Sequence, residues 1–277
     1  MIRIQVAMQQ CQALIVFTVL MLSVLVLAPA VASTFEHDRF DQLLSEHVVP
    51  INEGVSTEVD YRALLETRSE LQTYLDELAG VSRERFDRWP EDDQLAFLIN
   101  AYNAWTLELI LTEYPDLDSI RDLGWLFQSP WKRDFVDLLG EERSLDNIEH
   151  DLIRGSGRYN EPRIHFAVNC ASIGCPALRS EAYTADQLDA QLEEQTRWFL
   201  ADRSRNRLDG SDLEVSSIFD WYREDFEAGW RGESTLAGFL TLYADDLGLS
   251  DDEVSRLTDG DIDIEFLDYD WALNDLN

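Results

Sequence analysis

Basic residues are scarce in this chain of 277 residues. Lysine and arginine together number 22, against 55 aspartate and glutamate residues, which gives a formal net charge of −33. Lys132 is the only lysine. Because a field of this sign repels phosphate backbones and anionic lipid, the composition argues against nucleic acid and membrane surfaces as partners. The acidic residues are spread along the whole chain, as is typical of a solvated acidic surface.

The sequence motifs of several large enzyme classes are also absent. The chain has no phosphate-binding loop, no G-x-G-x-x-G fingerprint, no G-x-S-x-G elbow and no H-E-x-x-H zinc motif, so these enzyme classes lose their usual support and no cofactor is expected. There is also no internal repeat, low-complexity tract or long Gly/Ser linker. Residues 33–277 are therefore expected to form one domain with one well-buried core.

The first 32 residues differ from the rest and resemble a secretory signal peptide. Arg3 is followed by an almost wholly apolar run over 13–27 and by the small-x-small pattern Ala30-Val31-Ala32. This order predicts cleavage before Ser33 and export to the periplasm or the medium, with no membrane segment afterwards. The alternative is an uncleaved anchor, since the apolar stretch has about the 20 residues that a membrane helix needs.

Hydrophobic spacing predicts a mainly helical α+β fold with a small, mostly antiparallel sheet. The strands do not alternate regularly with the helices, which argues against a doubly wound sheet. Helices are predicted over 33–49, 62–79, 91–113, 144–154, 184–200 and 219–227. Extended segments are predicted near 59–61, 135–139, 164–168, 213–218 and 262–267.

The helix predicted over 91–113 is apolar nearly all round, so it should lie in the middle of the fold. Asn100 and Asn103 share one face of it, because residues three apart are neighbours on a helix. A buried asparagine is unfavourable unless its amide is hydrogen-bonded. The pair, with Tyr102 between them, is therefore expected to hold a structural loop or to form the floor of a binding pocket.

The chain has only three cysteines, and Cys11 would leave with the signal peptide. Cys170 follows the apolar run 164–168 in a polar loop, a common place for site residues. As a nucleophile it would need a histidine to activate its thiolate. No histidine follows Cys170, so the papain order is excluded and the base would be upstream, His150 or His165. Glu149 or Asp151 could then orient the imidazole of His150, and Glu149 is taken as the orienting residue.

Three other interpretations of these residues remain open. In an oxidising compartment Cys170 and Cys175 could form a disulfide, which would leave a non-catalytic binding module. His165 could be a core histidine on a buried strand. His150, His165 and the two cysteines are also the correct ligand types for zinc, although their spacing differs from the usual C-x2-C knuckle.

Further residues could complete a pocket around Cys170. The backbone near Ser172 could donate hydrogen bonds to an oxyanion. Trp131 and Tyr222 could supply aromatic walls, although aromatic residues at such positions are more often part of the core. The ligand itself, whether a small molecule, a peptide or a glycan, is not indicated by the sequence.

Several runs, taken in order, resemble the domain-of-unknown-function 547 (DUF547) family. They are LINAYNA at 98–104, SLDNIEH at 144–150, HFAVNCASIGCP at 165–176, WYREDF at 221–226 and YDWALN at 269–274. The resemblance covers roughly 50–275. It implies an exported bacterial protein with Asn100, His150, His165 and Cys170 in one pocket, and a fold that could be a permuted relative of papain or transglutaminase. The leading hypothesis is therefore a cysteine-dependent hydrolase or acyl transferase.

Overall fold

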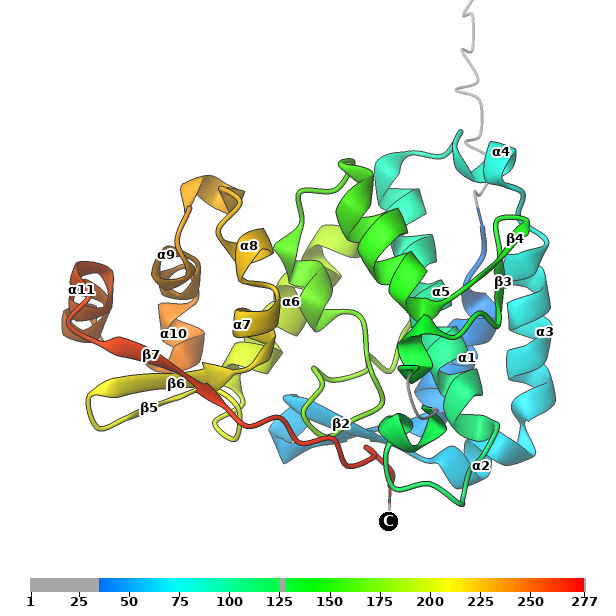
Figure 1. Ribbon diagram of the computed structural model, residues 1–277, viewed down its shortest axis with the longest axis horizontal. Helices are drawn as coiled ribbons and strands as arrows, with labels where there is room; N and C mark the ends of the chain where they lie inside the picture. Colours follow the sequence, from blue (N-terminus) through cyan, green and yellow to red (C-terminus); the bar gives the residue numbers. More distant parts are fainter. Residues whose placement is uncertain (1–34, 125–127, 277) are drawn as a thin grey trace, which may run out of the picture. The chain divides into compact units, whose positions relative to one another are not determined.

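The computed structural model describes residues 35–124 and 128–276. The predicted signal peptide, residues 1–32, lies outside the described residues and is not tested. Within the described ranges no helix is long and apolar enough to cross a membrane. The described residues pack as one compact unit around two adjoining hydrophobic clusters. The fold is α+β and mainly helical (Figure 1).

The first cluster is built from the N-terminal elements around α5. These elements are α1 (Asp38–His47), β1 (Val48–Ile51), β2 (Ser56–Val59), α2 (Tyr61–Glu66), α3 (Arg68–Ala79), α4 (Arg83–Phe86), α5 (Glu91–Leu111), β3 (Val136–Leu138) and β4 (Glu141–Arg143). α5 begins after Pro90 with three acidic residues in its first turn, which complement the positive end of the helix dipole. Nearly all of its residues are buried, so the prediction of a central helix is confirmed.

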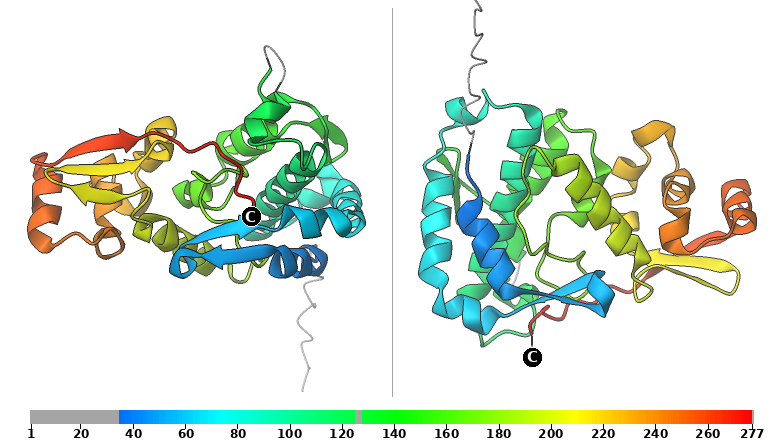
Figure 2. Two further views of the ribbon diagram at one scale, coloured as in Figure 1. Left: turned by 90° about the horizontal axis from the view of Figure 1, so that it is seen from below. Right: turned by 180° about the vertical axis from the view of Figure 1, so that it is seen from behind.

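The second cluster lies around a three-stranded sheet and short helices. The elements are α6 (Leu188–Ala201), β5 (Arg207–Asp209), β6 (Asp212–Ser216), α7 (Ile218–Trp221), α8 (Arg223–Phe226), α9 (Leu236–Thr241), α10 (Ala244–Leu247), α11 (Asp251–Asp259) and β7 (Asp263–Leu267). Figure 2 shows helices packed against one side of the β5–β6–β7 sheet. The strands predicted at 213–218 and 262–267 are confirmed as β6 and β7.

The prediction of one small sheet is wrong, because the strands form three separate sheets in the described residues. β1 pairs with β2, β3 with β4, and β5 with β6, all antiparallel, whereas β6 and β7 pair in parallel. Each antiparallel pair is a local hairpin, and hairpins that lie far apart in the fold do not join. The parallel pair arises because the chain returns through α7–α11 before it forms β7.

Short non-α helices connect the two clusters and replace a predicted strand. They include the π-helical η4 (Asn147–Ile153), η5 (Arg154–Ser156) and the 3₁₀ helix η6 (Pro162–Phe166). The strand predicted over 164–168 is therefore wrong. Pro162 stands at the start of η6, and the Glu161 side chain caps it through the backbone of Arg163. Such a start is helical in spite of the β-rich composition that follows.

Three predicted helices have different limits in the structure. The helix over 62–79 is divided into α2 and α3 at Thr67, whose backbone is not helical. The helix predicted from 184 begins at Leu188, and Thr184 does not cap it. Over 219–227 the chain forms α7 and α8 instead of one helix.

The C-terminal segment after β7 ties the two clusters together. It runs from β7 to the edge of β2 (Figure 1), where Val59 and Asp275 form a parallel bridge. On its way it pairs with the loop that carries the cysteines, since Ser172 bridges Leu273. The loop and the segment pack closely: a Cβ atom on Gly174 would lie 2.9 Å from both the Asp270 carbonyl oxygen and the Tyr269 ring.

Candidate functional site

A cavity of about 220 Å³ lies where the two clusters and the C-terminal segment meet. Its aromatic lining comprises Tyr102, Trp131, Trp221, Tyr222, Tyr269 and Trp271, and its polar lining includes Asp146, Glu149, His150, His165 and Cys170. These residues come from α5, η3 (Pro130–Lys132), η4, η6, α7 and the cysteine loop, with two from the C-terminal segment. The fold thus brings together the four residues predicted to be catalytic, as well as Tyr102, Trp131 and Tyr222 from the predicted binding set.

His165 is buried in the cavity wall and is held by Asp225, a residue that the sequence did not single out. The His165 Nε2 and Asp225 Oδ2 atoms are 2.6 Å apart. Burial lowers the pKa of His165, although Asp225 and Glu149 act against this. Burial alone would raise the pKa of Asp225, but hydrogen bonds from His165 and Arg154 outweigh it and hold that pKa well below its ordinary value.

These directions determine where the proton of His165 lies. The Asp225 carboxylate is ionised and can only accept, so Nε2 of the neutral His165 ring carries the hydrogen. The Nδ1 atom is then an unprotonated acceptor. It is buried and has no hydrogen-bond partner among the described residues. His165 thus has a basic nitrogen without a partner, buried within the cavity wall.

His150 has other hydrogen-bond partners than His165, and Arg154 links it to Asp225. Arg154 Nη1 donates to His150 Nδ1 at 2.7 Å, and His150 Nε2 lies 3.6 Å from Asp146 Oδ1. Arg154 also forms a bidentate salt bridge with Asp225, with Nε 2.5 Å from Oδ2 and Nη2 3.2 Å from Oδ1. Of the two histidines at the cavity, His165 is therefore the one with a ring nitrogen that lacks a partner among the described residues. Its orienting group is Asp225 instead of the predicted Glu149.

Glu149 is a carboxylate in an aromatic environment. Its side chain is 5% exposed, and its Oε1 atom is buried without a hydrogen-bond partner among the described residues. Burial, then the charge of Glu149 and hydrogen bonding to its carboxylate, raise the pKa values of the Tyr102 and Tyr222 hydroxyls. The carboxylate is thus bonded to tyrosine hydroxyls, while its Oε1 atom lacks a partner, which is energetically unfavourable for a buried carboxylate oxygen.

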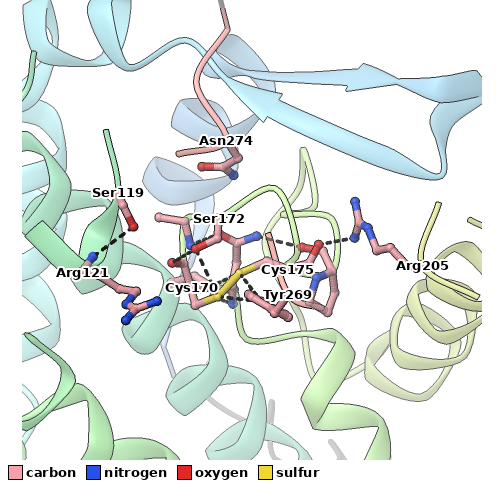
Figure 3. Close-up of a disulfide and its surroundings, with 12 residues drawn as sticks. Ser119, Arg121, Cys170, Ser172, Cys175, Arg205, Tyr269 and Asn274 are labelled. Carbon is pink, nitrogen blue, oxygen red and sulfur yellow. Dashed lines mark hydrogen bonds between the residues drawn. A yellow bond between two sulfur atoms is a disulfide. The ribbon is translucent and has the colours of Figure 1, made fainter. Parts of the chain in front are cut away.

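Cys170 and Cys175 are joined in a disulfide (Figure 3). Cys170 is half-buried and lines the cavity, whereas Cys175 is 2% exposed. The Tyr269 hydroxyl lies 3.0 Å from Cys170 Sγ and 3.3 Å from Cys175 Sγ. In this bridge Cys170 has no thiolate, so it cannot act as the nucleophile predicted from the sequence. The alternative interpretation, a disulfide, is the one that the structure contains.

The predicted asparagine pair and Ser172 do not line the cavity. Asn100 exchanges two hydrogen bonds with the backbone of Tyr183, at 2.8 and 3.0 Å. Asn103 donates to the Ala167 carbonyl and accepts from the Asn169 N–H. Both asparagines thus hold loops, one of the two outcomes expected from the sequence. The implication of the family resemblance that Asn100 lies in the pocket is therefore wrong, because its amide is used by the Tyr183 backbone. Asn103 supports the segment that leads into Cys170.

Four of the aromatic side chains at the cavity, those of Trp131, Trp221, Tyr269 and Trp271, form one continuous wall. Trp221 stacks on Trp271 at 5.7 Å, and Tyr269 contacts both tryptophans, at 4.9 and 4.5 Å. Trp131 meets the edge of Trp271 at 5.7 Å. On the other side His165 stacks on Tyr222 at 3.9 Å. Trp221 is 47% exposed, so the wall reaches solvent.

A zinc site is not supported. Within residues 35–124 and 128–276 no group of three His, Cys, Asp or Glu side chains is arranged to hold a metal ion. The bridged cysteines also lack the thiolates that would bind zinc.

Comparison with known proteins gave one match. Residues 86–200 match the model of a family described as "Protein of unknown function, DUF547". This range is narrower than the 50–275 expected from the sequence, but it contains α5, the histidines of the cavity and both cysteines. No curated protein and no solved structure matches, so the relationship to papain or transglutaminase has no support.

Proposed function

The chain belongs to the DUF547 family, and we propose that it is an exported protein that binds a small organic cation in the cavity beside Glu149. The observation that carries this proposal is the buried Oε1 atom of Glu149, which has no hydrogen-bond partner among the described residues, in a cavity lined by aromatic rings. Ammonium groups bind the faces of aromatic rings, and most strongly that of tryptophan. A ligand cation would both stack on this wall and neutralise the carboxylate.

The charges around the cavity favour a cation over an anion. Arg154 and Asp225 neutralise each other, and the lowered pKa keeps His165 uncharged near neutral pH. Glu149 and Asp146 therefore set the local sign. The net charge of −33 adds a long-range attraction for cations.

The size of the cavity limits the ligand. At about 220 Å³ it is smaller than the roughly 300–1,000 Å³ that pockets for drug-sized ligands occupy. It therefore suits one substituted ammonium group. The exposed Trp221 could contact a neutral extension of the same molecule.

Export is supported by the signal-peptide pattern of residues 1–32 and by the disulfide, since disulfides persist in oxidising compartments. A cysteine-dependent hydrolase or acyl transferase would need a thiolate at Cys170. The oxidised protein offers none, so a binding function is preferred.

Binding can be tested with choline and its neutral isostere 3,3-dimethylbutan-1-ol. Because three tryptophans line the cavity, tryptophan fluorescence and calorimetry should both report occupancy. We expect saturable choline binding and at least tenfold weaker binding of the isostere, a difference of about 1.4 kcal/mol. Glu149→Gln should weaken choline binding about tenfold, whereas Glu142→Gln, on the exposed part of β4, should leave it unchanged. Equal binding of choline and the isostere would rule out recognition of charge.

A further inference from the structure

The two sulfur atoms of the disulfide lie in different surroundings. Cys170 lines the cavity and is half-buried, whereas Cys175 is almost inaccessible at 2% exposure. The backbone N–H of Cys170 donates to Cys175 Sγ at 2.9 Å, and the Tyr269 hydroxyl lies 3.3 Å from the same sulfur. A thiol that enters the cavity therefore meets Cys170 first. Cys175 Sγ has two hydrogen-bond donors beside it, one of which, the Tyr269 hydroxyl, also lies 3.0 Å from Cys170 Sγ.

This asymmetry matches the requirements of thiol–disulfide exchange. In that reaction a thiolate attacks one sulfur of a disulfide and the other sulfur leaves as a thiolate, more readily when the leaving thiolate is stabilised. Hydrogen bonds to a charged group favour the charged form. The N–H of Cys170 and the O–H of Tyr269 would stabilise Cys175 as the leaving thiolate.

The same cavity contains a base for the incoming thiol. His165 Nδ1 is unprotonated and without a hydrogen-bond partner among the described residues. Its Nε2 is held by the ionised Asp225, which would stabilise the imidazolium that forms when Nδ1 takes a proton. This arrangement of base and orienting carboxylate has no role in cation binding by Glu149.

We propose that the protein oxidises small thiols at the Cys170–Cys175 disulfide. His165 Nδ1 takes the proton of the thiol R–SH, and the thiolate R–S⁻ attacks Cys170 Sγ. The bond between the two cysteines breaks, its electron pair passes to Cys175, and R–S–S–Cys170 is formed. A second thiolate attacks the R sulfur, which releases R–S–S–R and leaves Cys170 as a thiolate. The protons of the two thiols end on Cys170 and Cys175, so one disulfide is reduced for each R–S–S–R formed.

The products can be located by mass spectrometry on the full chain. Intact mass first establishes that the bridge is present, by the absence of two hydrogen atoms. The protein is then mixed with 2-mercaptoethanol, a neutral thiol whose reaction does not depend on cation binding, and is quenched with N-ethylmaleimide. We expect the thiol adduct on Cys170 and the maleimide on Cys175. An adduct on Cys175 instead, or no reaction faster than that of oxidised glutathione at equal thiol concentration, would overturn the proposal.

The role of His165 is tested by the pH profile of the exchange rate. At pH 6.5 His165→Gln should slow exchange at least tenfold, because general-base catalysis contributes a factor of about 10² to 10⁴. At pH 9.5, where solvent supplies more thiolate, variant and wild type should converge. His47→Gln is the matched control, a buried histidine bonded to Thr67 away from the cavity, and should react like wild type. Unchanged exchange in His165→Gln at pH 6.5 would contradict the assignment.

A second variant keeps the test decisive if His165→Gln does not fold. Tyr269→Phe retains the ring against Trp221 and Trp271 but removes the O–H next to both sulfurs. It should slow the appearance of the mixed disulfide several-fold at every pH. An unchanged rate would exclude stabilisation of the leaving thiolate by Tyr269. Choline binding by wild type is measured separately, so failure of either proposal can be recognised on its own.

Discussion

His37 should make the protein less stable in mild acid. The residue precedes α1, is 8% exposed, and packs against the rings of Phe35 and Phe97. Its Nδ1 atom lies 2.6 Å from the Tyr74 hydroxyl. Burial lowers the pKa of His37 from 6.5 to about 3. As the pH falls below 6.5, His37 therefore binds a proton in the unfolded chain but not in the folded protein, and the free energy of unfolding decreases.

The size of this effect follows from the two pKa values. With 6.5 in the unfolded state and about 3 in the folded state, the loss is negligible at pH 7.5 and reaches about 2 kcal/mol at pH 5. Asparagine at this position does not titrate, and its Oδ1 can replace Nδ1 as the partner of Tyr74. His37→Asn should therefore gain about 2 kcal/mol relative to wild type between pH 7.5 and pH 5.

The assay is urea unfolding of both proteins at pH 7.5, 6.5 and 5.0. At each pH the free energy of unfolding of wild type is subtracted from that of the variant. The subtraction removes the contribution of the many carboxylates, because both proteins contain them. Tyr74→Phe is the control. It should lower stability by about 1 kcal/mol but leave the pH dependence intact, because burial is the cause of the pKa shift. Parallel stability curves for wild type and His37→Asn would refute the reasoning.

Two further predictions concern the loops around the cavity. Asn100→Leu should destabilise the protein by about 2–5 kcal/mol in urea unfolding, because it leaves the buried N–H and C=O of Tyr183 without partners; a loss below 0.5 kcal/mol would contradict this. Gly174→Ala should cost about 1–3 kcal/mol, since its Cβ would lie 2.9 Å from the Tyr269 ring. Gly80→Ala, where the nearest atoms are at 3.4 Å, should change stability little, and equal effects of the two would exclude a steric cause.

Local features of the fold could be predicted because local physical chemistry produces them. The acidic first turn and continuous apolar surface of α5 identify a buried helix without reference to any other segment. The strand β6 likewise follows from its own composition. The strand predicted over 164–168 is wrong because the environment of this segment is set by distant parts of the chain. Its apolar residues suit a buried strand, but the segment lies between the two clusters, where Phe166 packs into one and Ile164 into the other.

The sheets show the same limit at longer range. Hairpins such as β3–β4 are local and were predictable. The parallel pairing of β6 with β7 joins residues about fifty positions apart, for example Leu213 with Ile264. Spacing along the chain contains no information about such a partner, because many registers would bury the same apolar faces.

The sequence predicted the residues of the candidate site better than the contacts between them. The family resemblance placed Asn100, His150, His165 and Cys170 in one pocket. The two histidines and Cys170 line the cavity, as does Glu149, the residue predicted to orient the base, whereas Asn100 does not. Asp225 was visible only as part of the run WYREDF. The contact that makes it the partner of His165 spans sixty positions, so the orienting role was given to Glu149, the neighbour of a histidine in sequence.

By itself the sequence determined the acidic character of the protein, its mainly helical α+β class, its central apolar helix and the short list of residues able to do chemistry. These properties depend on composition and on spacing within single segments. Only the tertiary structure decided that the two cysteines form a bridge and that Asn100 and Asn103 hold loops. It also decided that His165 Nδ1 has no partner among the described residues and that Glu149 shares a cavity with aromatic rings. Those outcomes depend on which distant groups come into contact and on how much water the packing excludes. The residue pattern of a single segment predicts neither.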